Sequence, residues 1–590
     1  MIFLRRALTG SIAAAAFACF AVPGVASSAE VYCVNVSGGD CTQTGYSGAS
    51  GFQQALDDAA DNVLSPGPDT VRLGAQSYVA PLGNGFNYSS GNAPVAIRGS
   101  GQGQTTIAMQ TPPSVPVDFT IYDGLGVFAP GSSVSDVTVS MPAPANAANT
   151  NQQYRGLEMG TGAAVANVRI EDAGQQLNGF GLTVDGGVVG DVTIELENTM
   201  FPPVIGISPL NESAQDLVVR DSAIEASAPI RYFNSTGPGM LRVRRSQLRA
   251  GGSGAGVRVE SGTATVESTR LRVGSSGAGV SVEGGTATVE NTLVDLGSGF
   301  NVVGLRAANF EDGDAPMSID ADHVTIVGGG PSSIGVHAVA NSTQDGADAT
   351  ADVSNTVIDG PGVALSVEAG QADEATLTTR YSNYDPANNV NDPNLAPPPG
   401  VTALSEANRT TLAPGFVGAA NFHLGATSPL IDAGVPAAPA PGATDIDGNA
   451  RALDGDKNCV ARRDIGADEF VPAPPPPDCS GGGPPPNGDA ISNEFSFGKV
   501  KKNRKRGTAK LTVNVPGGGE LELAKSKKVK AAGKRAEAPG DVRLPIKPKG
   551  KAKRKLNDRG KAKVKAAVTF TPDGGEPNIQ SKRVRLVKRR

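Results

Sequence analysis

Two consecutive stretches of this 590-residue chain repeat each other at an offset of 23 residues. The first reads Gly-Ala-Gly-Val-Arg-Val-Glu-Ser-Gly-Thr-Ala-Thr-Val-Glu from Gly254, and the second reads Gly-Ala-Gly-Val-Ser-Val-Glu-Gly-Gly-Thr-Ala-Thr-Val-Glu from Gly277. Each copy alternates apolar and polar residues in short runs that glycines interrupt, which is typical of strands and turns. A repeat of this length without a helix predicts one turn of a parallel β-solenoid.

One inward position can be followed from each predicted turn to the next. Steps near 24 residues indicate plain turns, and longer steps predict inserted loops near residues 142–155, 309–316 and 341–349. The first inward column is expected to contain Val139, Ile170, Ile194, Val219, Val243, Val266, Val289, Ile319, Val353 and Leu377. A second inward column is expected to contain Ile224, Leu248, Leu271, Val294 and Ile358. These columns predict a core of stacked aliphatic side chains.

The position that follows the first column is often charged: Glu171, Glu195, Arg220, Arg244, Glu267 and Glu290. We expect an outward ladder in which Glu195 faces Arg220 and Arg244 faces Glu267. Each exposed pair of this kind should contribute only about 0–1 kcal/mol.

Before the first predicted turns, the run Phe52-Gln-Gln-Ala-Leu-Asp-Asp-Ala-Ala places Phe52, Ala55, Leu56 and Ala59 on one helical face. We expect this helix to cover the open end of the solenoid, where unpaired backbone groups otherwise invite aggregation.

Residues 1–29 have the order of an export signal, with Arg5-Arg6, an apolar run over 7–22 and small residues up to Ala29. No other long apolar segment occurs, so we expect no transmembrane segment and a secreted or cell-surface location, with a general or twin-arginine export route. Removing the signal leaves Cys33, Cys41, Cys459 and Cys479, which allow three pairings. Their positions favour Cys33–Cys41 and Cys459–Cys479, bonds that an oxidising compartment permits.

The charge is divided along the chain. Residues 490–590 contain 30 Lys+Arg and 8 Asp+Glu, a balance of +22, whereas the remainder has 22 and 50, a balance of −28. A Pro/Gly-rich linker over 471–489 separates the two parts. After it, alternating runs such as Leu511-Thr-Val-Asn-Val and Val564-Lys-Ala-Ala-Val predict a small antiparallel sandwich with lysines at outward positions and turns, including 499–506 and 547–555. The basic module should bind polyanions; the alternatives are that it neutralises its own acidic solenoid or is a soluble spacer.

Near the end of the acidic part stand Asn421-Phe-His-Leu, Ser428-Pro-Leu-Ile-Asp-Ala-Gly, Thr444-Asp-Ile-Asp-Gly-Asn and Asp464-Ile-Gly-Ala-Asp-Glu-Phe. With the repeats, these motifs resemble the right-handed parallel β-helix family of pectate-lyase-like exported bacterial proteins, and the basic part looks like an immunoglobulin-like module. The resemblance implies an all-β chain, a right-handed parallel β-helix solenoid followed by a small antiparallel β-sandwich. We expect a signal peptide over 1–29, a β-helix with an N-terminal cap helix over 30–470, the linker over 471–489 and the basic module over 490–590.

In this family, lyases commonly use acidic residues for a metal and Arg or Lys as the base, and hydrolases use grouped aspartates. Asp320, Asp322 and His323 are the best local match, because two carboxylates two residues apart share one face of a strand. The alternative is a solvated turn between two strands. Arg220, Arg244 and Arg245 form a basic spot that could receive an anionic sugar, although charge pairing between strands explains it more simply.

Asp445, Asp447 and Asn449 repeat oxygen-bearing side chains at every second position, a spacing that suits Ca²⁺. The sequence lacks the bidentate Glu of a Ca²⁺ loop, and the closing motifs of the family also account for these residues. We expect no cofactor other than Ca²⁺. His337 and His423 are expected to have no partners.

The leading functional hypothesis is a monomeric protein that engages polysaccharide or a cell-wall polymer along the face of the solenoid. The alternatives are a polysaccharide lyase or glycosidase that acts on acidic glycans, and a structural or adhesive surface protein. A groove lined by aromatic side chains would favour sugar binding, and a cluster of Asp and Arg would favour an enzyme.

Overall fold

The computed structural model describes residues 29–61, 68–89, 91–112, 119–142, 152–172, 178–196, 204–210, 215–234, 239–308, 316–341, 348–473, 495–515, 518–536, 540–572 and 578–589. Nearly all of the expected signal peptide, most of the expected linker with Cys479, and most of the expected inserted loops lie outside these residues. The chain divides into two compact units, Met1–Ala264 and Thr265–Arg590. Turns of a parallel β-solenoid, about 11 in all, make up most of the described chain, which confirms the predicted fold.

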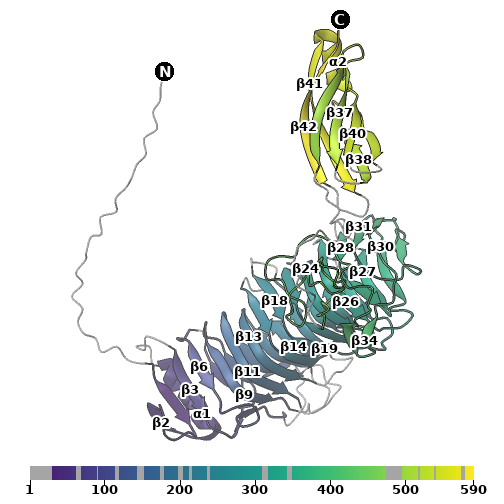
Figure 1. Cartoon of the computed structure of the whole chain (residues 1–590). Coiled ribbons are helices and arrows are strands. Elements are labelled where there is room, and N and C mark those ends of the chain that lie inside the picture. The colour runs from purple at the N-terminus through teal and green to yellow at the C-terminus, as the bar shows by residue number, and fades with distance from the viewer. Residues whose placement is uncertain are drawn as a thin grey trace, which may run out of the picture. The chain divides into compact units, whose positions relative to one another are not determined.

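In the first unit, strands from successive turns pair in parallel and form two sheets (Figure 1). The first sheet contains β1 (Val31–Val34), β2 (Gln43–Tyr46), β3 (Asp69–Leu73), β4 (Ser77–Val79), β6 (Val95–Arg98), β7 (Thr106–Ala108), β9 (Ser133–Ser140), β11 (Ala163–Glu171), β13 (Gly187–Glu195), β15 (Leu217–Arg220), β16 (Ala223–Ala226), β18 (Met240–Arg244) and β19 (Gln247–Ala250). The second contains β5 (Phe86–Tyr88), β8 (Thr120–Val127), β10 (Gln152–Met159), β12 (Gly179–Val184), β14 (Val204–Pro209), β17 (Ala228–Tyr232) and β20 (Ala255–Val259).

Helix α1 (Gly48–Asp61) buries Phe52, Ala55, Leu56 and Ala59, the four residues predicted from the sequence. It packs against β1, β3 and β5 at the purple end of the solenoid in Figure 1. The expectation that the helix precedes the first turn is wrong, because β1 comes before it and pairs in parallel with β3. A disulfide between Cys33 and Cys41 ties β1 to the chain that follows it, as predicted.

A residue with left-handed backbone conformation bends the first sheet once in each turn. Asp136, Asn167, Asp191, Asp221 and Arg245 have φ between 45° and 61°, and strand pairing places them opposite one another. Asn and Asp tolerate this conformation better than most residues because their short polar side chains hydrogen-bond locally. The bend separates two inward columns of side chains within one sheet.

The bend exposes an error in the predicted register of the first unit. Ile194 pairs with Ile224, and Val189 pairs with Val219, so the predicted step from Ile194 to Val219 crosses from one column to the other. The expected Glu195–Arg220 contact is therefore wrong. Glu195 of β13 pairs with Glu225 of β16. The residue of β13 that pairs with Arg220 of β15 is Gly190.

The second unit continues with the same architecture; β21 (Thr263–Glu267) contains the residues at which the two units divide. One sheet contains β22 (Arg270–Val273), β24 (Gly285–Asp295), β26 (Met317–Val327), β28 (Ala349–Ser354), β29 (Val357–Asp359), β31 (Glu374–Arg380) and β33 (Val401–Ala407). The other contains β23 (Ala278–Val282), β25 (Val303–Ala308), β27 (Ile334–Ala340), β30 (Val363–Ala369) and β32 (Val390–Asp392).

The predicted first column is also shifted here. Val289 pairs with Ala321 and not with Ile319, which pairs with Ala287 instead. Leu377 pairs with Ala351 and not with Val353. A slip of two residues keeps a side chain on the same face of a strand, so alternation alone cannot detect it. The second column is confirmed over Leu271, Val294 and Ile358. It also contains Ile326, between Val294 and Ile358, which the sequence analysis did not include.

Glycines mark the place where the two sheets of the second unit come closest. A Cβ atom on Gly279 would lie 2.6 Å from Val294 Cγ1, and one on Gly304 would lie 2.8 Å from Ile326 Cγ2. Such distances leave no room for any side chain, so the Ala-Gly-Val tripeptide of the repeat serves this close approach. Gly156, Gly181, Gly206 and Gly335 have the same relation to an isoleucine of the second column.

After the last turn, a closing segment (residues 416–470) folds back onto the strands of the second unit. It begins with the antiparallel pair β34 (Phe416–Gly418) and β35 (Asn421–Leu424). Leu424, Leu430 and Ile465 of this segment share a small buried core with Val357 of β29. The segment is otherwise held by polar contacts, which are described below.

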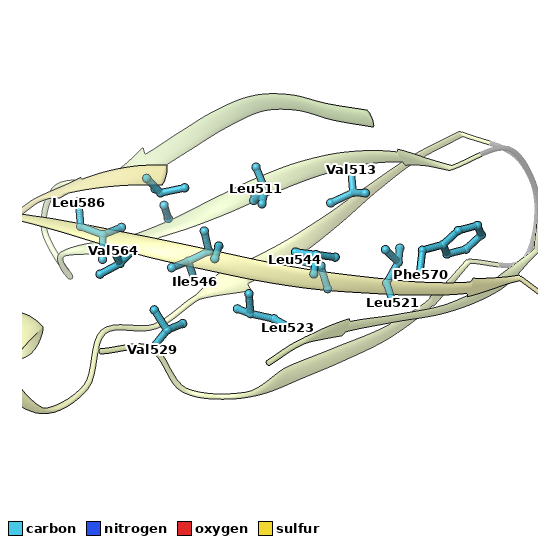
Figure 2. Close-up of a cluster of buried hydrophobic side chains, with 14 of the residues drawn as sticks. Leu511, Val513, Leu521, Leu523, Val529, Leu544, Ile546, Val564, Phe570 and Leu586 are labelled. Carbon is cyan, nitrogen blue, oxygen red and sulfur yellow. The ribbon is translucent and has the colours of Figure 1, made fainter. Parts of the chain in front are cut away.

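The basic module forms two antiparallel sheets, as predicted. One contains β36 (Ser496–Asn503), β37 (Thr508–Val515) and β40 (Gly540–Ile546), and the other contains β39 (Ala532–Ala536), β38 (Gly519–Leu523), β41 (Lys561–Pro572) and β42 (Asn578–Val587). Figure 2 shows Leu511, Val513 and Leu544 of the first sheet in one cluster with Leu521 and Phe570 of the second. The two sheets therefore share one core and form a sandwich.

One part of the module differs from the prediction. The lysine-rich stretch over 547–555 was expected to form a turn, but helix α2 (Gly550–Arg559) begins within it. Ala552 and Leu556, four residues apart, are buried and hold the helix against β41. Gly560 ends the helix in a left-handed conformation (φ 67°), and its N–H bonds to the carbonyl of Leu556.

Among the described residues, no helix has the length and apolar composition needed to cross a membrane.

Candidate functional site

Three outward positions on successive strands of the first unit bring together a carboxylic acid, a guanidinium and an aromatic ring. Asp123 of β8 pairs in register with Arg155 of β10, which pairs in register with Phe180 of β12. Neighbouring strands lie about 4.8 Å apart. The three side chains therefore form a short row on the outer face of the solenoid.

A second outward position beside this row holds a buried carboxylate. Glu158 of β10 is only 2% exposed. Its Oε1 lies 2.5 Å from an Arg155 guanidinium nitrogen and 3.3 Å from the hydroxyl of Thr183 on β12. The ion pair and the hydroxyl compensate the buried negative charge, and they fix the direction of the Arg155 side chain.

Asp123 differs from Glu158 in its surroundings. Burial raises the pKa of Asp123 to about 6, the charge of Glu158 adds to this rise, and Arg155 opposes it. The two neighbouring carboxyl groups thus have different environments, since Glu158 is ion-paired with Arg155 and burial raises the pKa of Asp123. Different environments of two carboxyl groups suit acid–base chemistry.

Several polar atoms at this site are buried and have no hydrogen-bond partner among the residues that the structure describes. They are Oδ1 of Asp123, Nε of Arg155 and Nε2 of Gln152, the last on the same strand as Arg155. Buried polar groups are nearly always satisfied in native proteins, and exceptions often occur where a ligand binds. The site offers both donors and acceptors, which suits a ligand rich in hydroxyl groups.

The sequence reasoning missed this site, although a signal was present. Tyr122-Asp-Gly-Leu and Tyr154-Arg-Gly-Leu share three of four residues, and Gly179-Phe-Gly-Leu preserves the last two. Superposing these tetrapeptides would have placed Asp123, Arg155 and Phe180 in one row. The inserted segments between them vary in length and conceal the repeat.

The arginines of the expected basic spot are paired with acids. Asp221 receives two hydrogen bonds from Arg245, at 2.7 and 2.9 Å, and one from Arg220, at 2.9 Å. Arg242 pairs similarly with Asp216 at 2.7 Å. Arg244 of β18 pairs in register with Arg220 of β15. These contacts favour the simpler interpretation, charge pairing between strands.

Asp320 and Asp322 lie on one face of β26, as expected, but they have different environments. Asp320 pairs in register with Asp352 of β28. Burial raises the pKa of Asp320, and the charges of Asp352 and Asp322 act in the same direction. Arg380 binds Asp352 at 2.9 Å. Asp320 is thus part of a solvent-facing acidic pair with a nearby arginine.

Asp322 is enclosed by hydrogen-bond donors. Ser354 Oγ and Asn355 Nδ2 donate to its Oδ1 at 2.7 and 2.6 Å, and His323 Nδ1 lies 3.0 Å from its Oδ2. Burial opposes ionisation, but these donors prevail and hold the pKa of Asp322 well below its usual range. Arg463 of the closing segment lies 3.9 Å from the same carboxylate. The stretch is a strand with a bend at His323 (φ 54°), so the alternative interpretation as a solvated turn is wrong.

His323 is almost fully buried, and burial lowers its pKa to about 4. The ring is therefore neutral at pH 7 and donates to Asp322 through Nδ1. The Nε2 atom has no partner among the described residues. His323 thus supports Asp322, whose ion pair with Arg463 joins the solenoid to the closing segment.

The oxygens of Asp445 are occupied by the protein itself. Oδ1 accepts the backbone N–H groups of Asp447 and Asn449 at 2.9 and 2.7 Å, and Oδ2 accepts that of Glu469 at 3.1 Å. Asp447 contacts Arg270 at 2.7 Å and His423 Nε2 at 2.6 Å. Among the described residues, two sets of three side chains lie close enough to share a cation. Asp432, Asp454 and Asp456 form one set, and His423, Asp447 and Asp468 form the other, so only Asp447 of the predicted residues belongs to either set.

The histidines have partners, contrary to expectation. His337 Nε2 lies 3.0 Å from Glu368 Oε1, and His423 contacts Asp447 and the side-chain oxygen of Asn421. Both histidines therefore take part in polar networks of the second unit.

Comparison with known proteins gives similarity in fold only. No protein-family model matches the chain, and no curated protein matches its sequence. The catalytic unit of a GH87 α-1,3-glucanase from Streptomyces thermodiastaticus strain HF3-3 is 15% identical, with a TM-score of 0.40, 61% of this chain covered and 65% of that chain. Pectate lyase Pel9A is 11% identical, with a TM-score of 0.35 and coverages of 75% and 97%. The A-module of the Azotobacter vinelandii mannuronan C-5 epimerase AlgE4 is 11% identical, with a TM-score of 0.29 and coverages of 62% and 93%. The chain spans less than two thirds of the length of the glucanase catalytic unit.

Proposed function

We propose that the protein binds a polysaccharide chain along the row formed by Asp123, Arg155 and Phe180. The observation that carries this proposal is the register of the three side chains on successive strands. An aromatic face can stack on a sugar ring, and the charged neighbours can hydrogen-bond its hydroxyl groups. A ligand made of several linked sugar units can contact all three strands of the row.

The buried polar atoms support the same partner. Asp123 Oδ1 and Arg155 Nε have no hydrogen-bond partner among the described residues. A bound sugar hydroxyl can both donate to the carboxyl oxygen and accept from the guanidinium. Binding would then remove the cost of leaving two buried polar atoms unsatisfied, which is about 1–3 kcal/mol for each group.

A secreted or cell-surface location goes with this proposal. The signal-like residues 1–29 support it, and so does the Cys33–Cys41 disulfide, because such bonds persist in oxidising compartments. The proposed partners are therefore polysaccharides that an exported protein can reach.

Binding can be tested by glycan-array and affinity-gel measurements on the full chain. The variants Phe180→Ala and Arg155→Gln should weaken retention by at least about fivefold, since each removes a contact of about 1 kcal/mol. The matched control is Phe300→Ala, because Phe300 is an aromatic residue that is 68% exposed in the second unit. If all three variants bind as the parent does, the row is not the binding site.

A second candidate function is cleavage of the bound chain, with Asp123 as the general acid. The raised pKa of Asp123, about 6, is the specific observation that favours it. A carboxyl group with this pKa holds a proton through mildly acidic pH and can give it to the oxygen of a glycosidic bond. Glu158, ion-paired with Arg155, is the neighbouring carboxylate.

Cleavage can be tested by following reducing ends released from the polysaccharides that bind. Asp123→Asn should abolish release but leave binding within about twofold, because the amide keeps the shape and the hydrogen bonding of the carboxyl group. The rate should fall as pH rises above about 6, since the acid then loses its proton. A parent protein that binds a glycan and releases no reducing ends from it would leave binding as the function.

A further inference from the structure

The basic module contains a wide groove whose lining is almost entirely cationic. The groove has a volume of about 1040 Å³. Eight of its ten lining residues are Lys or Arg, and the other two are Ala552 and Ala562. The cationic residues are Lys528, Lys551, Arg554, Lys555, Arg559, Lys561, Lys563 and Arg585. The sequence predicted a basic module, but not that its charges gather around one concave surface.

Local structure explains why the charges gather there. On α2, Lys551, Lys555 and Arg559 recur every four residues and so lie on one side of the helix. The burial of Ala552 and Leu556 turns another side toward β41. On β41, exposed Lys561 and Lys563 alternate with buried residues, as period-two geometry requires. Figure 2 shows Val564, one of these buried residues, directed into the core of the module.

Two cations of the groove lie directly opposite each other. Lys563 of β41 and Arg585 of β42 are partners in the antiparallel ladder, and both are exposed. Like charges at such positions repel and destabilise a sheet. Among the side chains that the structure describes, none of the eight cationic lining residues forms an ion pair with a carboxylate. A bound polyanion would relieve this repulsion.

The composition of the lining indicates which polyanion fits. Proteins that bind single-stranded nucleic acid add aromatic side chains on which bases stack, and the lining residues include no aromatic side chain. Lysine ammonium groups act as point charges, and arginine adds planar donors that suit carboxylate or sulfate groups. The groove therefore matches a ligand that carries a regular series of anionic groups along a flexible chain.

We propose that this groove is a second binding site, separate from the Asp123 row, and that it takes a linear acidic polysaccharide. The groove binds the charged groups of the polymer, and the polymer neutralises the Lys563–Arg585 repulsion. Since the rest of the chain has a formal charge of −28, the module supplies the cationic surface for such a ligand.

The test compares two double variants of the full chain, with immobilised polygalacturonate as the probe. Lys563→Gln/Arg585→Gln removes two cations inside the groove. Lys501→Gln/Lys510→Gln removes two exposed cations that are also direct cross-strand partners, on β36 and β37, but do not line the groove. The groove variant should raise Kd about fivefold to tenfold and reduce its dependence on salt, since each exposed charge contact contributes up to about 1 kcal/mol. The control variant should change Kd less than about twofold.

Three results would overturn the proposal. Equal weakening by both double variants would show that only net charge matters. Absence of parent binding to polygalacturonate at low salt would exclude this partner class, and tighter binding of a DNA duplex at equal anion concentration would assign the groove to nucleic acid. Neither double variant should lower the unfolding temperature, because each removes a repulsion between two cations. Measuring the unfolding temperature therefore distinguishes a loss of binding from a loss of folding. The readout is the difference between two double variants that both leave the Asp123 row intact, so this test does not depend on that of the proposed function.

Discussion

The side-chain Nδ2 of Asn355 donates a hydrogen bond to Oδ1 of Asp322 at 2.6 Å, across two neighbouring strands of the solenoid. The other end of the same side chain, Oδ1, accepts the backbone N–H of Val435 at 2.7 Å. Asn355 is only 1% exposed. One buried amide thus connects two turns of the solenoid and the closing segment.

This connection predicts that Asn355→Ala loosens the closing segment. The change leaves the N–H of Val435 without its partner, at a cost of about 1–3 kcal/mol for a buried group, and it removes one of the two donors to Oδ1 of Asp322, so that only Ser354 remains. Hydrogen exchange should then accelerate over residues 430–470. Asn388→Ala, at an exposed asparagine, is the control. Unchanged exchange in Asn355→Ala would show that other contacts suffice to hold the segment.

A buried charge in the core should disrupt several turns. Val353 is fully buried on β28, whereas Thr350 on the same strand is exposed. Val353→Asp places an unpaired charge in the interior, which costs several kcal/mol. Since neighbouring turns depend on one another, circular dichroism should report a large drop in unfolding temperature. Thr350→Asp should melt close to the parent, and similar melting of both variants would contradict the described register.

The close approach of the two sheets predicts that Gly304→Ala is strongly destabilising. The new Cβ would lie 2.5 Å from the carbonyl oxygen of Gly335 and 2.8 Å from Ile326 Cγ2, so strands must separate. Overpacking of this kind costs about 1–3 kcal/mol. Gly418→Ala is the matched control, because a Cβ there meets nothing within 4 Å. Urea unfolding should separate the two variants, and equal midpoints would mean that the strands adjust freely.

The closing segment should lose stability as pH rises through neutrality. Burial, together with the charge of Glu469, raises the pKa of Asp464 to about 8. An unfolded Asp titrates near 3.9, so between about pH 4 and pH 8 the folded state binds the proton more tightly. The contribution of the Asp464 proton to the stability of the folded state is complete below about pH 4 and is lost as pH increases to about 8.

Hydrogen exchange of residues 464–470 between pH 5.5 and 9, corrected for intrinsic rates, tests this dependence. Asp464→Asn should flatten the profile, although the amide also loses an acceptor for the N–H of Asp432 or Phe470. Asp385→Asn, at an exposed aspartate, should keep the slope of the parent. A parent profile without slope would mean that the pair Asp464 and Glu469 stays ionised.

The fold was predictable because its determinants are local and repeated. The 23-residue repeat specified the solenoid, and the positions of Phe52, Ala55, Leu56 and Ala59 specified α1. The register was less predictable, because a slip of two residues preserves burial and because the bend at residues such as Asp191 separates two columns. Helix α2 was missed because lysines suit turns and helices alike, and only the burial of Ala552 and Leu556 distinguishes them.

The candidate site was harder to predict, since it depends on contacts between turns. Asp123, Arg155 and Phe180 are dissimilar residues that become neighbours only after the turns stack. Asp320, Asp322 and His323 were visible because they are adjacent in sequence. Adjacency could not show that Asp322 is enclosed by Ser354, Asn355 and His323, since two of these come from another turn.

The glycines that let the sheets approach each other have a consequence for how the protein can change over time. Where Gly279 and Gly304 stand, the interior is too thin to admit a ligand, so every recognition surface of the described solenoid must lie outside its core. Outward residues can then be exchanged without repacking aliphatic columns. New specificities can arise on an unchanged scaffold, one outward side chain at a time, at little risk to folding.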